Sequence, residues 1–493
     1  MNNRYCVRII RSIIRNFKNV NKGDITYMNY GSINRRGLIE KTDIVGIYGQ
    51  NGSGKTALVE ALAIIKCLIS GASIPYEIYS GLLSKEDQTE LTTVFFIEQG
   101  EAKYKASYNA CLRINEEQKK IEIHKEKIVY WTRGSTWRAE RDIEFENPYY
   151  DYDNADILVQ KELKVVSKHF NNLKDITFLS SMQNLALISA QNYRSVFFNQ
   201  NVLRSIRELS NTQEITSFRD VITGIQQFGL VDLNVVKVNQ LGSININQII
   251  PINIHNETES TITQEVIPLI VAGVAEVPET YLHEVQAAMA AINIAIRSIV
   301  PGLQIDLRKK VDIEKPDGSK VIQVEAYSNR DGKTFLIKYE SEGIKRIISI
   351  LNYLISVFNN PGVCLVVDEL DSGIFEYLLG ELLGMMNKEM KGQLIFTSHN
   401  LRILEKLDAQ NIICSTVNPD NRYIRLVGIE KNNNKRDFYI RAITVGGQKE
   451  ELYDEDDLTA MGYAFRKAGE VNHNNVELAF SPEFERKLQD SNQ

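Results

Sequence analysis

The chain of 493 residues contains no apolar run long enough to span a bilayer, and it has only five cysteines. Those cysteines are scattered without paired spacing, which argues against a disulfide framework or a zinc site. At the N-terminus, arginines such as Arg8 and Arg11 interrupt the apolar residues, so the apolar middle of a secretory signal is lacking. These absences predict a cytoplasmic protein without a membrane segment.

The chain also lacks internal repeats, low-complexity tracts and the sustained heptads of a long coiled coil. Its composition, 43% hydrophobic and 24% charged, predicts a globular protein of two to three domains or lobes. The net charge of −6 is uneven, because residues 1–41 hold nine Lys/Arg and two acids whereas residues 446–493 hold five and eleven. A basic N-terminal face suits nucleic acid or an acidic partner, and a solvated edge with an acidic tail explains the charges equally well.

A glycine-rich segment at residues 49–56 fits the phosphate-binding loop pattern, in which two glycines are followed by Lys and Thr. Residues 44–48 read as a short buried strand before it, and residues 57–70 as the helix after it. A strand, loop and helix in this order aim backbone N–H groups and a helix N-terminus at an anion. We expect Lys55 to reach the β- and γ-phosphates of ATP and Thr56 to hold Mg²⁺. The residues expected to bind the nucleotide are Asn51, Gly52, Ser53, Gly54, Lys55 and Thr56.

Polar side chains also follow two continuous apolar runs, 363–367 and 394–397, that read as parallel strands buried on both faces. The first run ends in Asp368 and Glu369, and His399 follows the second. The carboxyl ends of parallel strands are where α/β sheets place ligands. We therefore expect Asp368 to hold Mg²⁺, Glu369 to orient or deprotonate the attacking water, and His399 to contact the γ-phosphate.

The remaining pattern predicts further strands and helices around this core. Residues 4–30 indicate two short strands around a turn at 21–24, and residues 92–112 and 119–130 continue the β pattern. Together these segments predict an antiparallel β-layer. The rest of the chain predicts helices over 155–230, 278–299 and 344–358, and strands over 231–254, 303–308, 321–328 and 334–339.

Several short motifs resemble those of ABC-type ATPases. Residues 368–373 (Asp-Glu-Leu-Asp-Ser-Gly) resemble the acidic pair and D-loop of that family, and residues 341–346 (Ser-Glu-Gly-Ile-Lys-Arg) resemble its signature. Residues 397–400 (Thr-Ser-His-Asn) resemble the histidine switch, and residues 15–18 (Arg-Asn-Phe-Lys) the opening strand of RecF- and SMC-like members. The resemblance implies the α/β fold of a P-loop NTPase of the ABC type, with a mixed central sheet, an antiparallel β-layer and an inserted α/β region.

In such ATPases two ATP molecules are held between two heads, so the resemblance implies a homo-oligomer, a dimer of heads or higher, with ATP and Mg²⁺ as cofactors. It also implies that Ser341 and Gly343 of one head act on the γ-phosphate bound to the other. The sequence departs from the family at Glu342, which replaces the usual second glycine of the signature. No glutamine switch can be placed beyond the candidates Gln99 and Gln183.

The signature and the acidic run look most similar to those of AAA-type ATPases in bacterial anti-phage systems, relatives of the overcoming-lysogenisation-defect family. Residues 445–453 and 464–469 also resemble the ending of these proteins. The resemblance covers about residues 1–70 and 334–470. Members with a nuclease carry a TOPRIM domain, for which no pattern follows here, and the acidic run 454–457 reads as a solvated helix start.

Three hypotheses follow from these motifs. The first is an ATP-hydrolysing sensor of an abortive-infection system, which responds to DNA or a phage protein and controls a separate effector such as a TOPRIM or HNH nuclease. The second is a DNA-repair or DNA-clamping ATPase of the RecF type. The third is a scaffold that binds ATP with little turnover.

The expected domain organisation follows the motifs. An N-terminal lobe with the phosphate loop spans 1–140, and a C-terminal lobe with signature, acidic pair and histidine switch spans 278–445. Between them, residues 141–277 are an insertion that serves oligomerisation or partner docking, or that only thickens the head. Residues 446–493 form an acidic tail.

Overall fold

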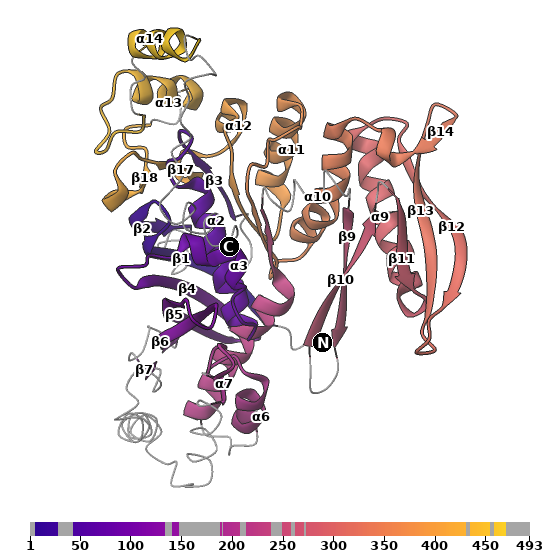
Figure 1. The fold of residues 1–493 in the computed structure, drawn as a ribbon, viewed down its shortest axis with the longest axis horizontal. Helices are drawn as coiled ribbons and strands as arrows, with labels where there is room; N and C mark the ends of the chain where they lie inside the picture. The colour runs from indigo at the N-terminus through magenta and orange to yellow at the C-terminus, as the bar shows by residue number, and fades with distance from the viewer. Residues whose placement is uncertain are drawn as a thin grey trace, which may run out of the picture. The chain divides into compact units, whose positions relative to one another are not determined.

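The computed structural model separates the chain into two compact units, residues 1–452 and 453–493. The first unit holds all the strands described below, and the second contributes the helix α14 (Leu458–Gly469) (Figure 1). The structure describes residues 5–27, 43–133, 141–146, 188–189, 191–207, 213–237, 249–257, 262–270, 273–429, 434–453 and 458–469.

A six-stranded mixed sheet forms the centre of the first unit, in the order β18-β17-β3-β16-β15-β8. Five neighbouring strands run parallel, and β18 pairs with β17 antiparallel. The predicted mixed central sheet is therefore confirmed. Its strands are β3 (Asp43–Tyr48), β8 (Leu233–Val236), β15 (Cys364–Val367), β16 (Gln393–Thr397), β17 (Ile412–Ser415) and β18 (Tyr423–Arg425).

Both faces of this sheet are buried, because successive side chains of each strand enter two different hydrophobic cores. Val45 and Ile47 of β3 point into one core together with α2 (Lys55–Ile69) and the antiparallel layer. Ile44 and Tyr48 point into the other core, which the helices on the far face complete. Those helices are α9 (Leu282–Ile299), α10 (Glu342–Asn359), α11 (Glu376–Glu389), α12 (Leu401–Lys406) and α13 (Lys435–Thr444).

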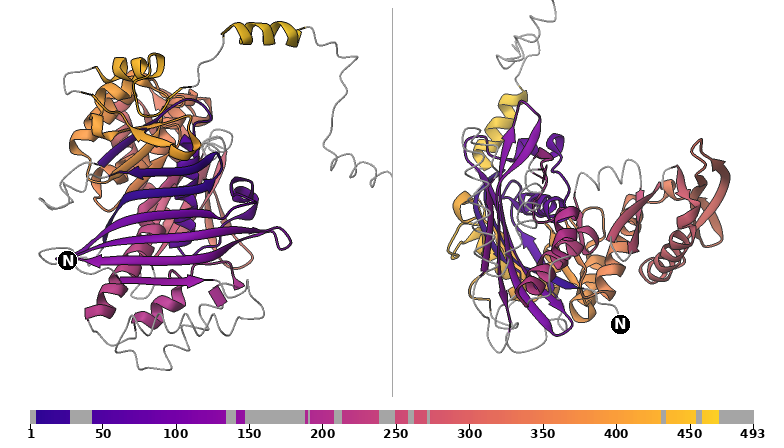
Figure 2. Two further views of the ribbon diagram at one scale, coloured as in Figure 1. Left: turned by 90° about the vertical axis from the view of Figure 1, so that its left-hand side faces the viewer. Right: turned by 90° about the horizontal axis from the view of Figure 1, so that it is seen from below.

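A second sheet is antiparallel throughout, in the order β2-β1-β4-β5-β6-β7, and Figure 2 (left) looks onto it. It confirms the expected β-layer. Its strands are β1 (Cys6–Phe17), β2 (Val20–Thr26), β4 (Thr89–Gln99), β5 (Ala102–Asn115), β6 (Lys120–Thr132) and β7 (Arg141–Glu146).

The turn expected at residues 21–24 was wrong. The chain reverses at Lys18 and Asn19, between Phe17 and Val20, which face each other across the hairpin. Lys18 takes a positive φ of 55°, as tight two-residue turns require. Gly23 lies instead within β2, where a Cβ would approach a ring carbon of Tyr423 to 2.5 Å. The glycine thus serves close packing and not the turn.

Two buried contacts join the layers. The side-chain amide of Gln393, at the start of β16, donates to the backbone oxygen of Ile9 at 2.8 Å and accepts from its N–H at 3.0 Å. Arg8 is buried and bonds Asp43 of β3 at 3.0 Å. Burial raises the pKa of Asp43 to about 6, against the opposing effect of the Arg8 charge. The two sheets are therefore fixed to each other at the N-terminal ends of β3 and β16, and the phosphate loop lies at the other end of β3.

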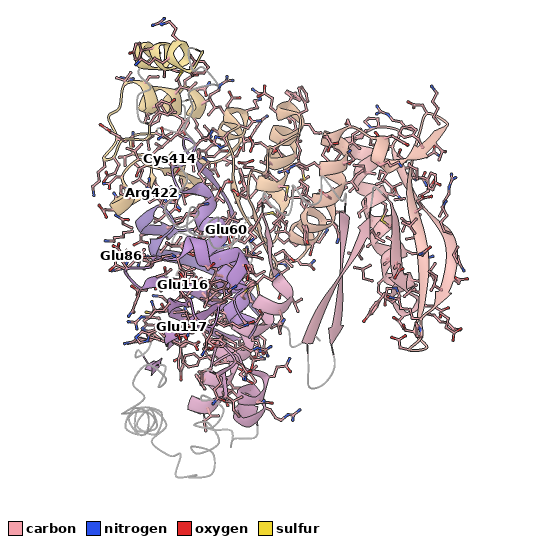
Figure 3. The ribbon with its side chains drawn as sticks, in the orientation of Figure 1. Glu60, Glu86, Glu116, Glu117, Cys414 and Arg422 are labelled. Atoms are coloured by element: carbon pink, nitrogen blue, oxygen red, sulfur yellow. The ribbon has the colours of Figure 1, made fainter. Side chains whose placement is uncertain are left out.

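The range expected as an insertion, 141–277, contains a strand of the core sheet. β8 pairs in parallel with β15 at the sheet edge. Directly after it, Lys237 donates to Glu60 of α2 at 3.1 Å, and Glu60 is labelled in Figure 3. The range also begins with β7, the edge strand of the antiparallel layer. Its other described elements include α6 (Gln200–Arg207), α7 (Gln213–Gln227), β9 (Ile249–Glu257), β10 (Ile262–Ile270) and the start of β11 (Val274–Pro278). The tip of the first unit is built by β12 (Gln304–Glu314), β13 (Lys320–Arg330) and β14 (Lys333–Leu336), which join β11 in one antiparallel sheet.

Candidate nucleotide site

The phosphate loop connects the end of β3 to the start of α2, as the sequence predicts. Gly54 is the N-cap of α2 and takes a φ of 92°, a conformation that a residue with a Cβ rarely adopts. No side chain caps this helix, and its first turn contains no acid. The first backbone N–H groups of α2 are therefore available to an anion placed over the loop.

Residues distant in the sequence donate hydrogen bonds to the carbonyl oxygens of the phosphate loop. The Asn19 amide donates to the carbonyl oxygen of Gly52, and the Tyr423 hydroxyl donates to that of Gly54 at 2.7 Å. Within the loop, the Ser53 hydroxyl donates to the carbonyl oxygen of Gln50 at 2.7 Å. These bonds fix the curvature of the loop before any ligand arrives.

Arg422, labelled in Figure 3, completes this support. Its guanidinium donates to the carbonyl oxygens of Thr416, at 2.7 Å, and of Asn19. Its methylene groups cover Gly54, where a Cβ would lie 3.1 Å from them. Arg422 therefore links the end of the core sheet, the β1–β2 turn and the phosphate loop in one contact.

Lys55, the first residue of α2, is buried and turned back onto its own loop. Its ammonium donates to the carbonyl oxygens of Gly49 and Gln50, at 2.8 Å each. Burial lowers the pKa of Lys55 to about 8, while the negative charges of Asp368, Glu369 and, less strongly, Asp371 oppose that shift. The lysine and the acidic residues thus lie within electrostatic reach of one another.

Asp368 lies at the end of β15 and is 1% exposed. One of its carboxylate oxygens accepts from the Thr397 hydroxyl, and the other has no partner among the described residues. A buried, unsatisfied carboxylate oxygen is costly unless a ligand or ion satisfies it. Such an oxygen is of the kind that Mg²⁺ takes, since this ion uses few protein ligands and fills its shell with phosphate oxygens and water. Thr56 lies on the first turn of α2, and its role as a second ligand stays a prediction.

Glu369 has a left-handed backbone, with a φ of 47°. Its N–H donates to the Thr397 hydroxyl oxygen at 2.7 Å, and the next N–H, of Leu370, donates to the Thr397 carbonyl at 3.0 Å. Its carbonyl oxygen accepts from Arg346 of α10 and from the Ser372 N–H. Such backbone conformations persist where the surroundings fix them, and they concentrate at functional sites.

His399 follows β16, the strand between β3 and β15. Its side chain is exposed, and its backbone N–H donates to Asp371 at 3.2 Å. Partial burial, and then the charge of Lys55, lower the pKa of His399, against the effect of Asp371 and the other acids. A neutral imidazole at this place could donate a hydrogen bond to a phosphate oxygen.

The signature residues lie at the start of α10. Ser341 is the N-cap of this helix and accepts from the Ile344 N–H at 3.4 Å. At Gly343, a Cβ would come within 2.5 Å of the carbonyl oxygen of Gly373 in the D-loop. The structure therefore gives Gly343 a packing role within the chain, and its expected action on a second head stays a prediction.

Sequence reasoning missed four residues that shape the site, namely Thr397, Arg346, Arg422 and Asn19. Thr397 stands beside His399 in the motif already identified, so its position alone was a usable signal. Arg346 likewise ends the signature segment 341–346, but its bond to Glu369 is non-local. The contacts of Arg422 and Asn19 also join distant segments, and no local pattern reveals them. Gln99 ends β4, where its amide lies beside Asp220 of α7 and Tyr5, so it is not placed at the site. Gln183 and the acidic run 454–457 lie outside the described residues.

Within the part of the chain that the structure describes, no helix has the length and apolarity needed to cross a membrane. Within the same part, no group of three or more His, Cys, Asp or Glu side chains could hold a metal ion. A site for Mg²⁺ would therefore depend on one carboxylate, a hydroxyl and the nucleotide itself.

Comparison with solved structures finds Smc and RecF heads at low similarity. The Smc head domain of Pyrococcus furiosus, bound to the C-terminal domain of ScpA, is 14% identical over 85% of this chain and 96% of its own, with a TM-score of 0.36. The SMC head domain from Thermotoga maritima is 13% identical over 85% and 100%, with a TM-score of 0.35. The recombination mediator protein RecF is 9% identical over 86% and 99%, also with a TM-score of 0.35. These values carry no conclusion about function.

No curated protein matches the chain. The fold itself, a mixed sheet with a phosphate loop after β3 and an acidic pair after β15, is that of a P-loop NTPase. A model of the family described as "AAA domain, putative AbiEii toxin, Type IV TA system" matches residues 44–405, well over half of the chain. The chain therefore belongs to this AAA family.

Proposed function

We propose that this protein binds ATP with Mg²⁺ and hydrolyses it, and that it acts as the sensor subunit of a bacterial anti-phage system. The observation that carries the ATPase proposal is the convergence of Lys55, Asp368, Glu369 and His399 at the carboxyl ends of three neighbouring strands. A cation for the phosphates, an unsatisfied carboxylate for the metal and a second carboxylate beside it are the groups that phosphoryl transfer to water uses.

Each residue has a distinct role in this proposal. Lys55 exchanges its two loop carbonyls for phosphate oxygens, and the N–H groups at the start of α2 bind the same phosphates. Thr56 and Asp368 would hold Mg²⁺, which supplies positive charge to the phosphates. Glu369 accepts a proton from the attacking water or orients it, and the neutral imidazole of His399 donates to the γ-phosphate.

Two observations favour a second copy of the chain as the partner of this surface. The start of α10 and the D-loop lie side by side, so one face presents Ser341 and Gly373 together. Exposed aromatic side chains flank that face, with Tyr339 70% exposed and Phe375 71% exposed. Large exposed apolar groups at such a position are typical of interaction sites. ATP would then bridge two heads, and hydrolysis would release them.

The biological part of the proposal rests on the family description, which links such AAA domains to a putative AbiEii toxin and a type IV toxin–antitoxin system. The acidic pair accounts for one reaction, and the described residues contain no group of three or more His, Cys, Asp or Glu side chains that could hold a metal for another. A cytoplasmic sensor of DNA or a phage protein, with a separate TOPRIM or HNH nuclease as effector, is consistent with both points.

The test compares the wild type with Lys55→Ala and Glu369→Gln, using Lys85→Ala and Glu376→Gln as exposed control variants. Lys55→Ala should abolish ATP binding measured by calorimetry. Glu369→Gln should keep ATP bound, slow turnover by about 100-fold or more, and accumulate the larger species in size-exclusion chromatography with ATP. Removing Mg²⁺ with a chelator should stop turnover in the wild type.

Other outcomes would favour the alternatives. ATP binding without turnover in the wild type would contradict the hydrolysis proposal and support a scaffold. ATP-dependent binding to duplex DNA that weakens steeply with salt, with no effector in the neighbouring genes, would favour a DNA-clamping ATPase. Turnover unchanged by Glu369→Gln would assign water activation to another residue.

A further inference from the structure

Arg346 carries a charged guanidinium but is buried, which is unusual for this residue type. It lies on the second turn of α10 and is only 3% exposed. Its guanidinium donates to the carbonyl oxygen of Glu369 and lies within electrostatic reach of Asp371, Glu369 and Asp368, in that order of strength. A buried arginine needs partners of this kind, because its charge cannot be removed by titration in the physiological range.

The carbonyl that Arg346 binds belongs to the residue with the left-handed backbone. The N–H of the same residue, Glu369, is held by Thr397 of β16. The backbone of Glu369 is thus bonded at both polar groups, its N–H to the core sheet and its carbonyl oxygen to α10. Its conformation therefore depends on the position of α10 as well as on the strand that precedes it.

The start of α10 is in direct contact with the D-loop. A Cβ at Gly343 would lie 2.5 Å from the carbonyl oxygen of Gly373, and a Cβ at Gly373 would lie 3.7 Å from the side chain of Arg346. There is no space between the helix and the loop in which one could move independently. A shift of the helix by a fraction of an ångström must be transmitted to the loop that carries Glu369.

We propose that Arg346 is a positioning residue for ATP hydrolysis, which holds the Glu369 peptide so that the carboxylate faces the attacking water. The same contact makes Glu369 sensitive to whatever binds the N-terminus of α10. This inference rests on the proposed ATPase function, and it adds that α10 regulates the catalytic carboxylate within its own chain. In this proposal Arg346 acts only through Glu369, whose carbonyl oxygen it binds.

The experiment uses the full-length variants Arg346→Ala and Arg346→Lys, with Lys345→Ala as the matched control. Lys345 is the preceding residue of the same helix and is similarly buried, but it bonds Glu342 and the Lys338 carbonyl and not the D-loop. Arg346→Ala should lower kcat on the order of 10- to 100-fold, because a misplaced Glu369 would lose part of the rate enhancement that a general base contributes. The Kd for ATP should stay within about two-fold of wild type. Arg346→Lys should recover part of kcat, and added guanidinium ion should raise kcat of Arg346→Ala but not of Lys345→Ala.

A combined variant separates positioning from simple destabilisation. If Arg346 acts through Glu369, adding Arg346→Ala to Glu369→Gln should lower kcat no further, because the two residues act as a unit. A structural role would instead lower kcat and ATP binding together in both backgrounds. An unchanged kcat in Arg346→Ala, alongside a strong loss in Glu369→Gln, would overturn the positioning role while leaving the ATPase proposal intact.

A readout independent of turnover covers the case in which the wild type does not hydrolyse ATP. Hydrogen exchange of the amides of Leu370 and Ser372, which bond Thr397 and Glu369, reports directly on the conformation of this loop. Arg346→Ala should accelerate that exchange relative to Lys345→Ala. Equal protection in the two variants would show that Arg346 does not hold the loop, whatever the fate of the proposed function.

Discussion

At the scale of single residues, charged groups of the site form hydrogen bonds to neighbouring protein groups in the absence of nucleotide. The ammonium of Lys55 is satisfied by two carbonyls of its own loop, and one oxygen of Asp368 by the hydroxyl of Thr397. ATP and Mg²⁺ must therefore replace existing bonds at the lysine, whereas at the second oxygen of Asp368 they satisfy an unpaired atom. The favourable free energy of ATP binding should therefore come mainly from the attraction between the phosphate charge and the buried ammonium of Lys55.

The lowered pKa of Lys55 gives ATP binding a characteristic pH dependence. With a pKa of about 8 in the free protein, Lys55 is mostly protonated at pH 7 and mostly neutral at pH 9. Binding needs the protonated form, so the Kd should rise about ten-fold between pH 7 and pH 9. Calorimetry in two buffers of different ionisation enthalpy should detect proton uptake on binding at pH 9.

Lys55→Arg provides the control, because a guanidinium stays charged across this range. If that variant binds ATP, its Kd should vary little between pH 7 and pH 9. A flat profile in the wild type would mean that the lysine retains its proton in the free protein.

At the scale of elements, the start of α10 is in close contact with the D-loop. Gly343→Ala would place a methyl group against the Gly373 carbonyl, so one of the two segments must move. We expect a loss of about 1–3 kcal/mol in the free energy of unfolding, as for other overpacked contacts. Turnover should fall together with it, because Glu369 lies on the displaced loop, while ATP binding should change little.

Gly384→Ala is the matched control for this change. It lies within α11, where a Cβ would make an ordinary contact with the Lys406 side chain at 3.6 Å or more. It should raise or preserve the urea midpoint, since Ala is the better helix former. A Gly343→Ala variant with wild-type stability and turnover would show that this contact has room to adjust.

Elements differ in how far the sequence could predict them. The apolar runs at 363–367 and 394–397 were unambiguous, because strands buried on both faces need apolar residues at every position. The β1–β2 turn was misplaced, since Gly23 suggested a turn but serves the packing of Tyr423. β8 was assigned to an insertion, because a four-residue strand carries little local signal and its pairing with β15 is non-local. For the same reason the sequence could not predict the partners of two arginines: Arg346, although it ends the signature segment, bonds Glu369, and Arg422 bonds Asn19.

At the scale of the whole molecule, the position of β8 limits where a partner could dock. The strand is part of the core sheet, so the full range 141–277 cannot be removed without opening the sheet beside Asp368. The second unit, from Tyr453 onward, clusters apart from the rest of the chain and is therefore the docking candidate that can be tested by removal. In the second unit, α14 carries exposed Tyr463 and Phe465, at 56% and 76% exposure.

We expect the purified chain to hydrolyse ATP without cutting DNA or RNA, and to capture the product of a neighbouring gene when ATP is present. Truncation after Leu452 should spare ATP binding and abolish capture and phage protection. Size-exclusion chromatography of the pair and plaque counts would measure both effects. Metal-dependent nuclease activity that persists in a partner-free host would contradict the two-protein scheme and direct attention to residues 454–457.

The contacts of Arg422 and Tyr423 with the phosphate loop have a consequence for synthesis on the ribosome. The loop ends at residue 56, but Arg422 and Tyr423, which hold it, are more than 360 positions later in the chain. At ordinary elongation rates that interval is roughly 20 to 70 seconds. A nascent chain should therefore expose a loop that cannot yet close on a nucleotide, and incomplete translation products should stay unable to compete for ATP or for a partner head.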